Sequence, residues 1–344
     1  MKTTKLPKAE LERFVSLLSR FGEVHAPVER NGDFVFERLT HWADARLDYT
    51  RTILPPKKYL LPPQETLFRF DAQNGYQPAA ARLGQRLVLF GVHACDVYGL
   101  NLLEEVFDGK YPDPYFQTRR KNVAIVGVDC VPDEHCFCRG MRADFVDHGF
   151  DLFLYDIGED YLVLVSTALG DDIVLAGQGL FREVTPADTD EYKRRSSAKR
   201  ETFQLDVEIR DLPEIFEMEY KSDIWEELGE RCLSCGACCM VCPTCYCYEL
   251  VDGVELGSCA GERMRCWDTC VFHTHALVAG GENFRENRAD RIKFRFYHKQ
   301  RGFVVQYGRP ACVGCGRCIV ACPVGINMVE EIERLRGARD TATC

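Results

Sequence analysis

The chain has 344 residues, with 43 Lys+Arg against 53 Asp+Glu and a formal net charge of −10. This acidic balance argues against nucleic-acid binding, because no basic excess is available to neutralise phosphates. The longest apolar runs, 87–92 and 123–128, are much shorter than the roughly 18 residues that a membrane span requires. The N-terminal segment lacks the apolar stretch of a signal peptide, so we expect a cytoplasmic protein.

The 19 cysteines are the most informative part of the composition. A secreted disulfide scaffold is short and carries an export signal, and the sequence predicts neither feature here. Thiols stay free in a reducing cytosol, so a cysteine content this high indicates metal binding.

In the first half of the chain, two continuous apolar runs, at 87–92 and 123–128, have the length of buried strands. Residues 96–107 between them carry apolar side chains at helical spacing. Strand, helix and strand together predict a βαβ unit in an α/β layer. Residues 151–155 and 161–165 predict a hairpin.

Cysteines follow both predicted strands. Loops at the carboxyl ends of neighbouring parallel strands converge in space, so these thiolates can hold an iron–sulfur cluster. Free cysteines are also common as small buried hydrophobic residues in protein cores. A C-x-C pair on a loop is not typical of such core residues. Both interpretations stay open on the residues alone. The cysteines in question are Cys95, Cys130, Cys136 and Cys138.

Two later segments, 232–243 and 312–323, each read C-x2-C-x2-C-x3-C-P, which is the run of bacterial ferredoxins. In two-cluster ferredoxins, three cysteines of a run hold one cluster and the fourth holds the other. Structural zinc typically uses two separated C-x2-C pairs, which explain neither the third cysteine nor the C-P ending. We therefore predict two [4Fe–4S] clusters, with the ligands Cys232, Cys235, Cys238, Cys242, Cys312, Cys315, Cys318 and Cys322.

Three further features of the sequence are not assigned to a cluster site. Cys239 is interpreted as a non-ligand, because Cys238 alone keeps the spacing of the run. The Arg-rich stretch 285–301 is interpreted as a solvated helix face, in preference to a positive rim that steadies anionic clusters. His93 is interpreted as a core or loop histidine.

Residues 188–202 are charged and fit a surface helix or linker, and the chain is acidic and helical from Asp211 to the first cysteine run. We therefore predict an α+β protein with a boundary near residue 215. An N-terminal α/β domain would span 1–215, and a mainly helical dicluster ferredoxin-like domain would span 216–344. No nucleotide-binding or hydrolase motif occurs, so no catalytic residues are assigned.

Several motifs resemble one family, which contains the beta subunit of cytosolic NiFe hydrogenases (sulfhydrogenases) and the corresponding iron–sulfur subunit of anaerobic sulfite reductase. The resemblance covers nearly the whole chain, and the residues of the motifs are closer to those of the hydrogenase branch. The motifs are G-V-H-A-C-D-V-Y-G-L (91–100), C-V-P-D-E-H-C-F-C (130–138), C-P-T-C-Y-C-Y-E (242–249), W-D-T-C (267–270) and C-V-G-C-G-R-C (312–318).

The resemblance implies a non-catalytic iron–sulfur subunit that relays electrons within a soluble complex. In hydrogenase relatives the neighbours are a flavoprotein subunit that binds NAD(P)(H) and the small and large NiFe subunits. In sulfite reductase relatives the electrons pass to a sirohaem subunit. A self-contained reductase would need an incomplete cysteine set, and both ferredoxin runs are complete.

The family pattern also bears on the remaining cysteines. It includes Cys95, Cys130, Cys136 and Cys138, which favours a third [4Fe–4S] cluster there. It includes three further cysteines for which the sequence offers no fourth partner: Cys245, Cys247 and Cys270. No role follows for Cys239, Cys259, Cys266 and Cys344.

Overall fold

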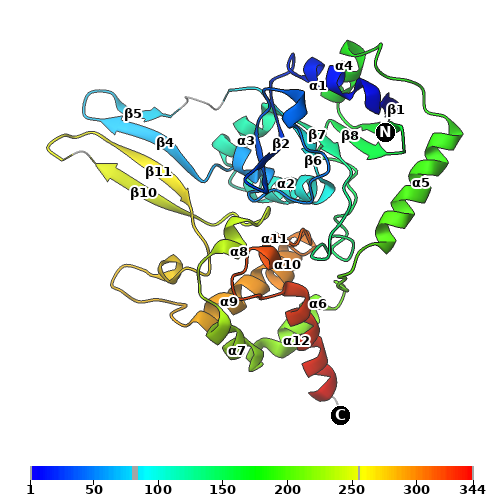
Figure 1. Cartoon of the computed structure of the whole chain (residues 1–344). Helices are drawn as coiled ribbons and strands as arrows, with labels where there is room; N and C mark the ends of the chain where they lie inside the picture. The colour runs from blue at the N-terminus through cyan, green and yellow to red at the C-terminus, as the bar shows by residue number, and fades with distance from the viewer. Residues whose placement is uncertain (1, 80–83, 255, 343–344) are drawn as a thin grey trace.

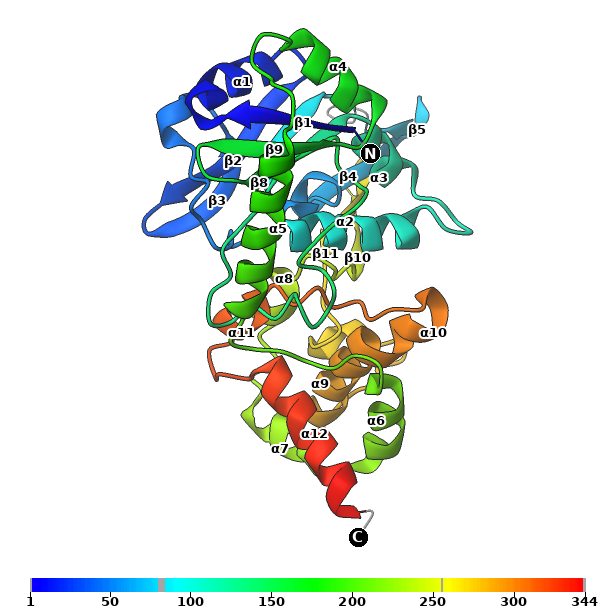
Figure 2. The ribbon, with the colours of Figure 1, turned by 90° about the vertical axis from the view of Figure 1, so that its right-hand side faces the viewer.

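The computed structural model describes residues 2–79, 84–254 and 256–342. Figures 1 and 2 show a sheet with helices on both faces, a group of helices below it, and a second, smaller sheet that projects to one side. None of the described helices is long and apolar enough to cross a membrane.

The larger sheet has seven strands in the order β1-β9-β8-β7-β6-β2-β3. Its four central strands, β2, β6, β7 and β8, are parallel, and the remaining pairings are antiparallel. The predicted parallel strands and the predicted hairpin are confirmed as β6, β7 and the β8–β9 pair. The bounds are β1 (Lys2–Pro7), β2 (Glu23–Arg30), β3 (Asp33–Arg38), β6 (Leu87–Val92), β7 (Val123–Val128), β8 (Leu152–Asp156) and β9 (Asp160–Val165).

Helices cover both faces of this sheet because its central strands are apolar on both sides. Phe14 of α1 and Ile173 of α4 pack against one face. Leu103 of α2 and Phe116 of α3 pack against the other. The predicted βαβ unit is confirmed, with α3 as an additional helix before β7. The bounds are α1 (Leu11–Leu18), α2 (Ala94–Phe107), α3 (Pro114–Lys121) and α4 (Ala168–Ala176).

The smaller sheet joins segments that are far apart in the sequence. It has the order β10-β11-β4-β5, and all of its pairings are antiparallel. Two strands precede the larger sheet's β6, and two come from the insert between the ferredoxin runs (Figure 1). The bounds are β4 (Gln64–Asp71), β5 (Gly75–Pro78), β10 (Tyr248–Val254) and β11 (Gly261–Trp267).

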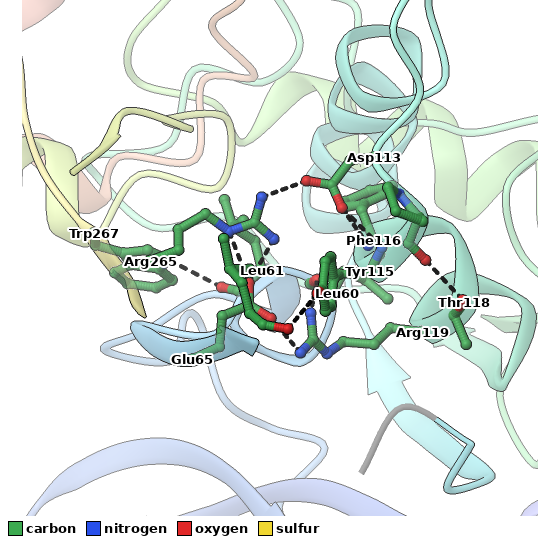
Figure 3. Close-up of polar contacts among 12 residues, drawn as sticks. Leu60, Leu61, Glu65, Asp113, Tyr115, Phe116, Thr118, Arg119, Arg265 and Trp267 are labelled. Atoms are coloured by element: carbon green, nitrogen blue, oxygen red, sulfur yellow. Dashed lines mark hydrogen bonds and ion pairs between the residues drawn. The ribbon is translucent and has the colours of Figure 1, made fainter. Parts of the chain in front are cut away.

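A buried ion-pair network fastens this sheet to α3 (Figure 3). The Arg265 side chain of β11 donates through Nε to Glu65 Oε1 of β4 at 2.8 Å, and it also pairs with Asp113. Arg119 of α3 pairs with the other oxygen of Glu65. Asp113 in turn caps α3 by accepting from the backbone N–H of Tyr115 at 2.9 Å. The network therefore connects β4, β11 and α3.

The C-terminal part of the chain is built mainly around helices that share one apolar core. Trp225 of α7 packs with Phe296 of α9, Phe216 of α6 and Ile332 of α12. The long helix α5, which has no buried residues, runs down one side of the molecule toward these helices (Figure 2). The bounds are α5 (Pro186–Glu201), α6 (Leu212–Met218), α7 (Ile224–Arg231), α8 (Ala237–Met240), α9 (Arg288–Tyr297), α10 (Phe303–Tyr307), α11 (Arg317–Val320) and α12 (Met328–Ala342).

The mixed α/β character of the chain is confirmed, but a mainly helical C-terminal domain is not, because β10 and β11 lie within it. Residue 215, where the sequence predicts the domain boundary, lies within α6. Short helical turns complete the structure. They are η1 (Lys8–Glu10), η2 (Trp42–Asp44), η3 (Pro56–Tyr59), η4 (Glu219–Lys221), η5 (His273–Ala276) and the π-helical η6 (His298–Gly302).

Candidate iron–sulfur centres

The two ferredoxin runs adopt the same local backbone. Gly236 precedes α8 with φ 77° and ψ −8°, and Gly316 precedes α11 with φ 72° and ψ −11°. Two residues earlier, Ser234 and Gly314 also have positive φ. These turns direct backbone N–H groups toward cysteine sulfur atoms. Ser234 N lies 3.4 Å from Cys232 Sγ, and Gly314 N lies 3.5 Å from the Sγ of the second run's first cysteine.

The first cavity combines cysteines of both runs. Helix α9 forms part of its wall through Ile292 and Phe296. Five cysteines line it: Cys232, Cys235 and Cys238 of the first run, and Cys318 and Cys322 of the second run. This is the crossed arrangement of two-cluster ferredoxins, in which the fourth cysteine of a run belongs to the other cluster's set.

The complementary set lies at the second run. Burial and the neighbouring thiols of Cys318 and Cys242 raise the pKa of Cys312 to about 12. Burial also raises the pKa of Cys315, and the Cys242 thiol adds to this effect. The Cys242 thiol therefore acts on Cys312, Cys315 and Cys318, as expected for the crossed pattern, and its direct contact is with the Cys245 thiol.

The structure brings the third predicted set together as well. Cys95 lies in the first turn of α2, at the end of β6, and its thiol contacts that of Cys138. Burial raises the pKa of Cys130 to about 12 and that of Cys136 to about 11, and the Cys95 thiol contributes to both shifts. These mutual effects place the four thiols close together.

The second and third sets are direct neighbours. Cys315 packs against a buried cluster that contains Cys95, Cys136 and Cys138, and the Cys95 thiol contributes to its raised pKa. The Phe137 N–H donates to Gly314 O at 2.8 Å, so the C-x-C loop is bound to the second ferredoxin run.

A buried ion pair also joins these two sets. Arg317, between two cysteines of the second run, donates two hydrogen bonds of 2.7 Å to the carboxylate of Asp96, which follows Cys95. Both side chains are almost fully buried. Such bidentate pairs fix orientation strongly, so this pair holds α11 against α2.

Three buried cations lie among the cysteines: Lys57, Arg295 and Lys299, which are 2%, 4% and 3% exposed. Among the described residues, none of them forms an ion pair with a carboxylate, and Arg295 Nε has no hydrogen-bond partner. Burial lowers the pKa of Lys299, but the thiols of Cys242 and Cys245 raise it above its usual value. Buried cations need anionic partners, so their position fits residues that bind anionic thiolate clusters.

The solvated-face prediction for 285–301 is therefore wrong for part of that stretch. Arg291 and Arg295 of α9 are buried, whereas Arg288 is exposed. The sequence pattern did not indicate this difference, because it does not show which thiols face the helix.

His93 is confirmed as a core histidine. It is 1% exposed and stacks on Tyr49 at 3.9 Å between ring centroids. Cys259 is exposed, Cys266 lies on β11, and Cys344 lies outside the described residues. Cys239 is buried beside Cys245 and Cys270, a grouping that the sequence did not reveal.

Paired ferredoxin runs with crossed cysteines and buried cations define a dicluster iron–sulfur protein. Residues 231–326 match the 4Fe-4S dicluster domain family. The whole chain is similar to sulfhydrogenase 2 subunit beta of Pyrococcus furiosus, with 38% identity over 341 residues that cover 98% of this chain and 99% of that protein. The chain belongs to the sulfhydrogenase beta-subunit family, and it is an iron–sulfur electron-transfer subunit.

Proposed function

We propose that the chain relays electrons between the NiFe small and large subunits of a hydrogenase complex and an NAD(P)H-dependent flavoprotein subunit. Two [4Fe–4S] clusters would be held by the crossed ferredoxin sets, and a third by Cys95, Cys130, Cys136 and Cys138. A bound [4Fe–4S] cluster supplies reversible one-electron transfer. The similarity to a sulfhydrogenase beta subunit favours this complex over the sulfite reductase alternative.

The observation that carries the proposal is the continuity of the cysteine sets. Cys242 and Cys322 each lie with the cysteines of the other run, so the first two sets are adjacent. Cys315 of the second set packs against the buried cluster that contains cysteines of the third set. A chain whose clusters served only to stabilise separate loops would not need sets in contact. A relay requires clusters at short distances from one another, and sets in contact provide this.

The protein residues have three tasks in this proposal. The cysteines hold the clusters, and the apolar side chains of α9 and α12 exclude water from the first cavity. Lys57, Arg295 and Lys299 balance the negative charge of the sets. Burial, nearby charge and backbone N–H groups directed at sulfur are the features that set cluster potentials.

The proposed complex can be tested by anaerobic isolation through this subunit, followed by assays for nickel and sirohaem. We expect nickel, hydrogen-dependent reduction of NAD(P)+ and a co-purifying flavoprotein. Sirohaem with sulfite consumption would contradict the hydrogenase assignment and establish the sulfite reductase alternative. A chain isolated alone that reduces a small molecule by itself would contradict the relay.

The third set can be tested by replacing Cys130 with Ser in the full-length chain. Loss of one four-thiolate set should remove about four irons and four acid-labile sulfides per chain. Iron and sulfide analysis of anaerobically purified protein measures this difference. The matched control is Cys259→Ser, because Cys259 is exposed and belongs to none of the sets. Equal iron and sulfide in wild type, in Cys130→Ser and in Cys130→Ala, which offers no side-chain ligand, would exclude the third cluster.

A further inference from the structure

Four cysteines that lie outside the three predicted sets line a separate small cavity. They come from three segments: α8, the C-x-C loop after the first ferredoxin run, and the loop after β11. Cys239 and Cys270 are buried and pack together, with two half-buried cysteines against them. The members are Cys239, Cys245, Cys247 and Cys270.

The helical phase of α8 explains how adjacent cysteines serve different cavities. Consecutive residues of a helix point about 100° apart around its axis. Cys238 lines the first cavity, and Cys239 lines the other one, although their sulfur atoms are only 4.0 Å apart. Cys239, the additional cysteine within the first run, therefore belongs to the second cavity.

The thiols of this group are in mutual reach. Cys239 is within hydrogen-bonding reach of Cys245 and Cys270. Cys270 is in turn within reach of Cys247. These contacts connect all four sulfur atoms, and they continue to the first ferredoxin run, since Cys239 is also within reach of Cys238 and Cys245 is within reach of Cys242.

The charges around the cavity favour an anionic occupant. Arg295 and Lys299 line it, and Lys57 Nζ donates to Cys245 O at 2.8 Å. Asp268 also lines the cavity, but its carboxylate pairs with His275. The buried cations therefore face thiols on this side as well as at the ferredoxin sets.

We propose that Cys239, Cys245, Cys247 and Cys270 bind an additional iron–sulfur cluster. Four thiolates are the full ligand set of either a [2Fe–2S] or a [4Fe–4S] cluster. A structural zinc ion needs its ligands around one point. Within the described parts of the chain, no three His, Cys, Asp or Glu side chains are arranged to hold a single metal ion. The site adjoins the first ferredoxin set through Cys238 and Cys239, so the cluster would lie beside the relay.

Metal analysis of the full-length, anaerobically purified chain tests the proposal. We expect Cys239→Ser and Cys247→Ser each to lose about two or four irons with an equal number of sulfides, depending on the cluster type. Cys259→Ser is the matched control and should keep the wild-type content. Cys247 lies outside both ferredoxin runs, so its variant separates this site from the first set.

A count on the wild-type chain does not depend on whether a variant folds. Three [4Fe–4S] clusters account for about 12 irons, so an additional cluster predicts about 14 or 16 by iron analysis and Mössbauer spectroscopy. Unchanged iron in both variants, or loss of zinc without sulfide, would overturn the proposal. The proposal is separate from the relay, because losing this site would leave the other sets loaded.

Discussion

At the scale of single residues, Gly316 shows how closely the cluster loops are packed. Its φ of 72° lies in the left-handed region, which side chains other than glycine adopt at a cost of about 1–2 kcal/mol. A Cβ at this position would also lie 2.6 Å from the backbone oxygen of His135. Both effects act on the loop that holds the second cysteine set.

Gly308 provides a matched comparison, because it has the same φ of 72° and nothing within 4 Å of a Cβ. We expect Gly308→Ala to lower the free energy of unfolding by about 1 kcal/mol through backbone strain alone. Gly316→Ala should be more destabilising and should also lower the iron content, because the loop must move away from His135. Thermal unfolding and iron analysis measure both effects. Equal behaviour of the two variants would contradict the packing argument.

The buried cations are the residues whose environment the sequence could not predict. A run of arginines usually marks a solvated face. Arg295 is buried, and the thiols of Cys238, Cys239 and Cys318 lie around it and raise its pKa. Recognising this requires the tertiary arrangement of the cysteines, since the pattern of charges along α9 is the same in either case.

At the scale of elements, the smaller sheet depends on the network around Glu65. This carboxylate accepts hydrogen bonds from Arg265 of β11 and Arg119 of α3, and it is 8% exposed. Removing one partner of a buried ion pair leaves an uncompensated charge and typically costs about 3–5 kcal/mol. The attachment of β10 and β11 to the rest of the molecule should therefore be sensitive to this residue.

We expect Glu65→Gln to lower the free energy of unfolding by about 3–5 kcal/mol and to speed hydrogen exchange in β4 and β11. Asp252→Asn is the control, because Asp252 pairs with Arg263 on the exposed part of the same sheet and should change neither quantity. Denaturant unfolding and hydrogen–deuterium exchange measure the effects. Unchanged exchange in β11 would mean that the network does not hold the sheet.

The elements that sequence patterns predict well are those with a strong local signal. β6 and β7 have the predicted bounds because their continuous apolar runs leave no alternative to burial. The smaller sheet was missed because β10 is largely exposed and β11 pairs with β4, which lies nearly 200 residues earlier. Such pairings depend on contacts that no local periodicity records.

At the scale of the whole molecule, the cysteine spacings predicted the two ferredoxin runs, and convergence at the sheet edge suggested the third group. The group around Cys239 could not be found by spacing, because its members lie on three segments. Its partners Cys245 and Cys270 are separated by the β10–β11 hairpin, and only the fold brings them to α8. A doubled cysteine inside a ferredoxin run is the one local signal that could have indicated a second site.

The central claim is that electrons pass through this chain. Cys315 tests this claim most directly, because it belongs to the second set and packs against the buried cluster that contains cysteines of the third set. The measurement is hydrogen-dependent NAD(P)+ reduction by the intact complex carrying Cys315→Ala, with Cys259→Ala as the control. We expect overall turnover to be lost, while dye reduction by the catalytic subunits with hydrogen and by the flavoprotein with NAD(P)H continues. Unchanged overall turnover in a complex that has lost this cluster would contradict the relay.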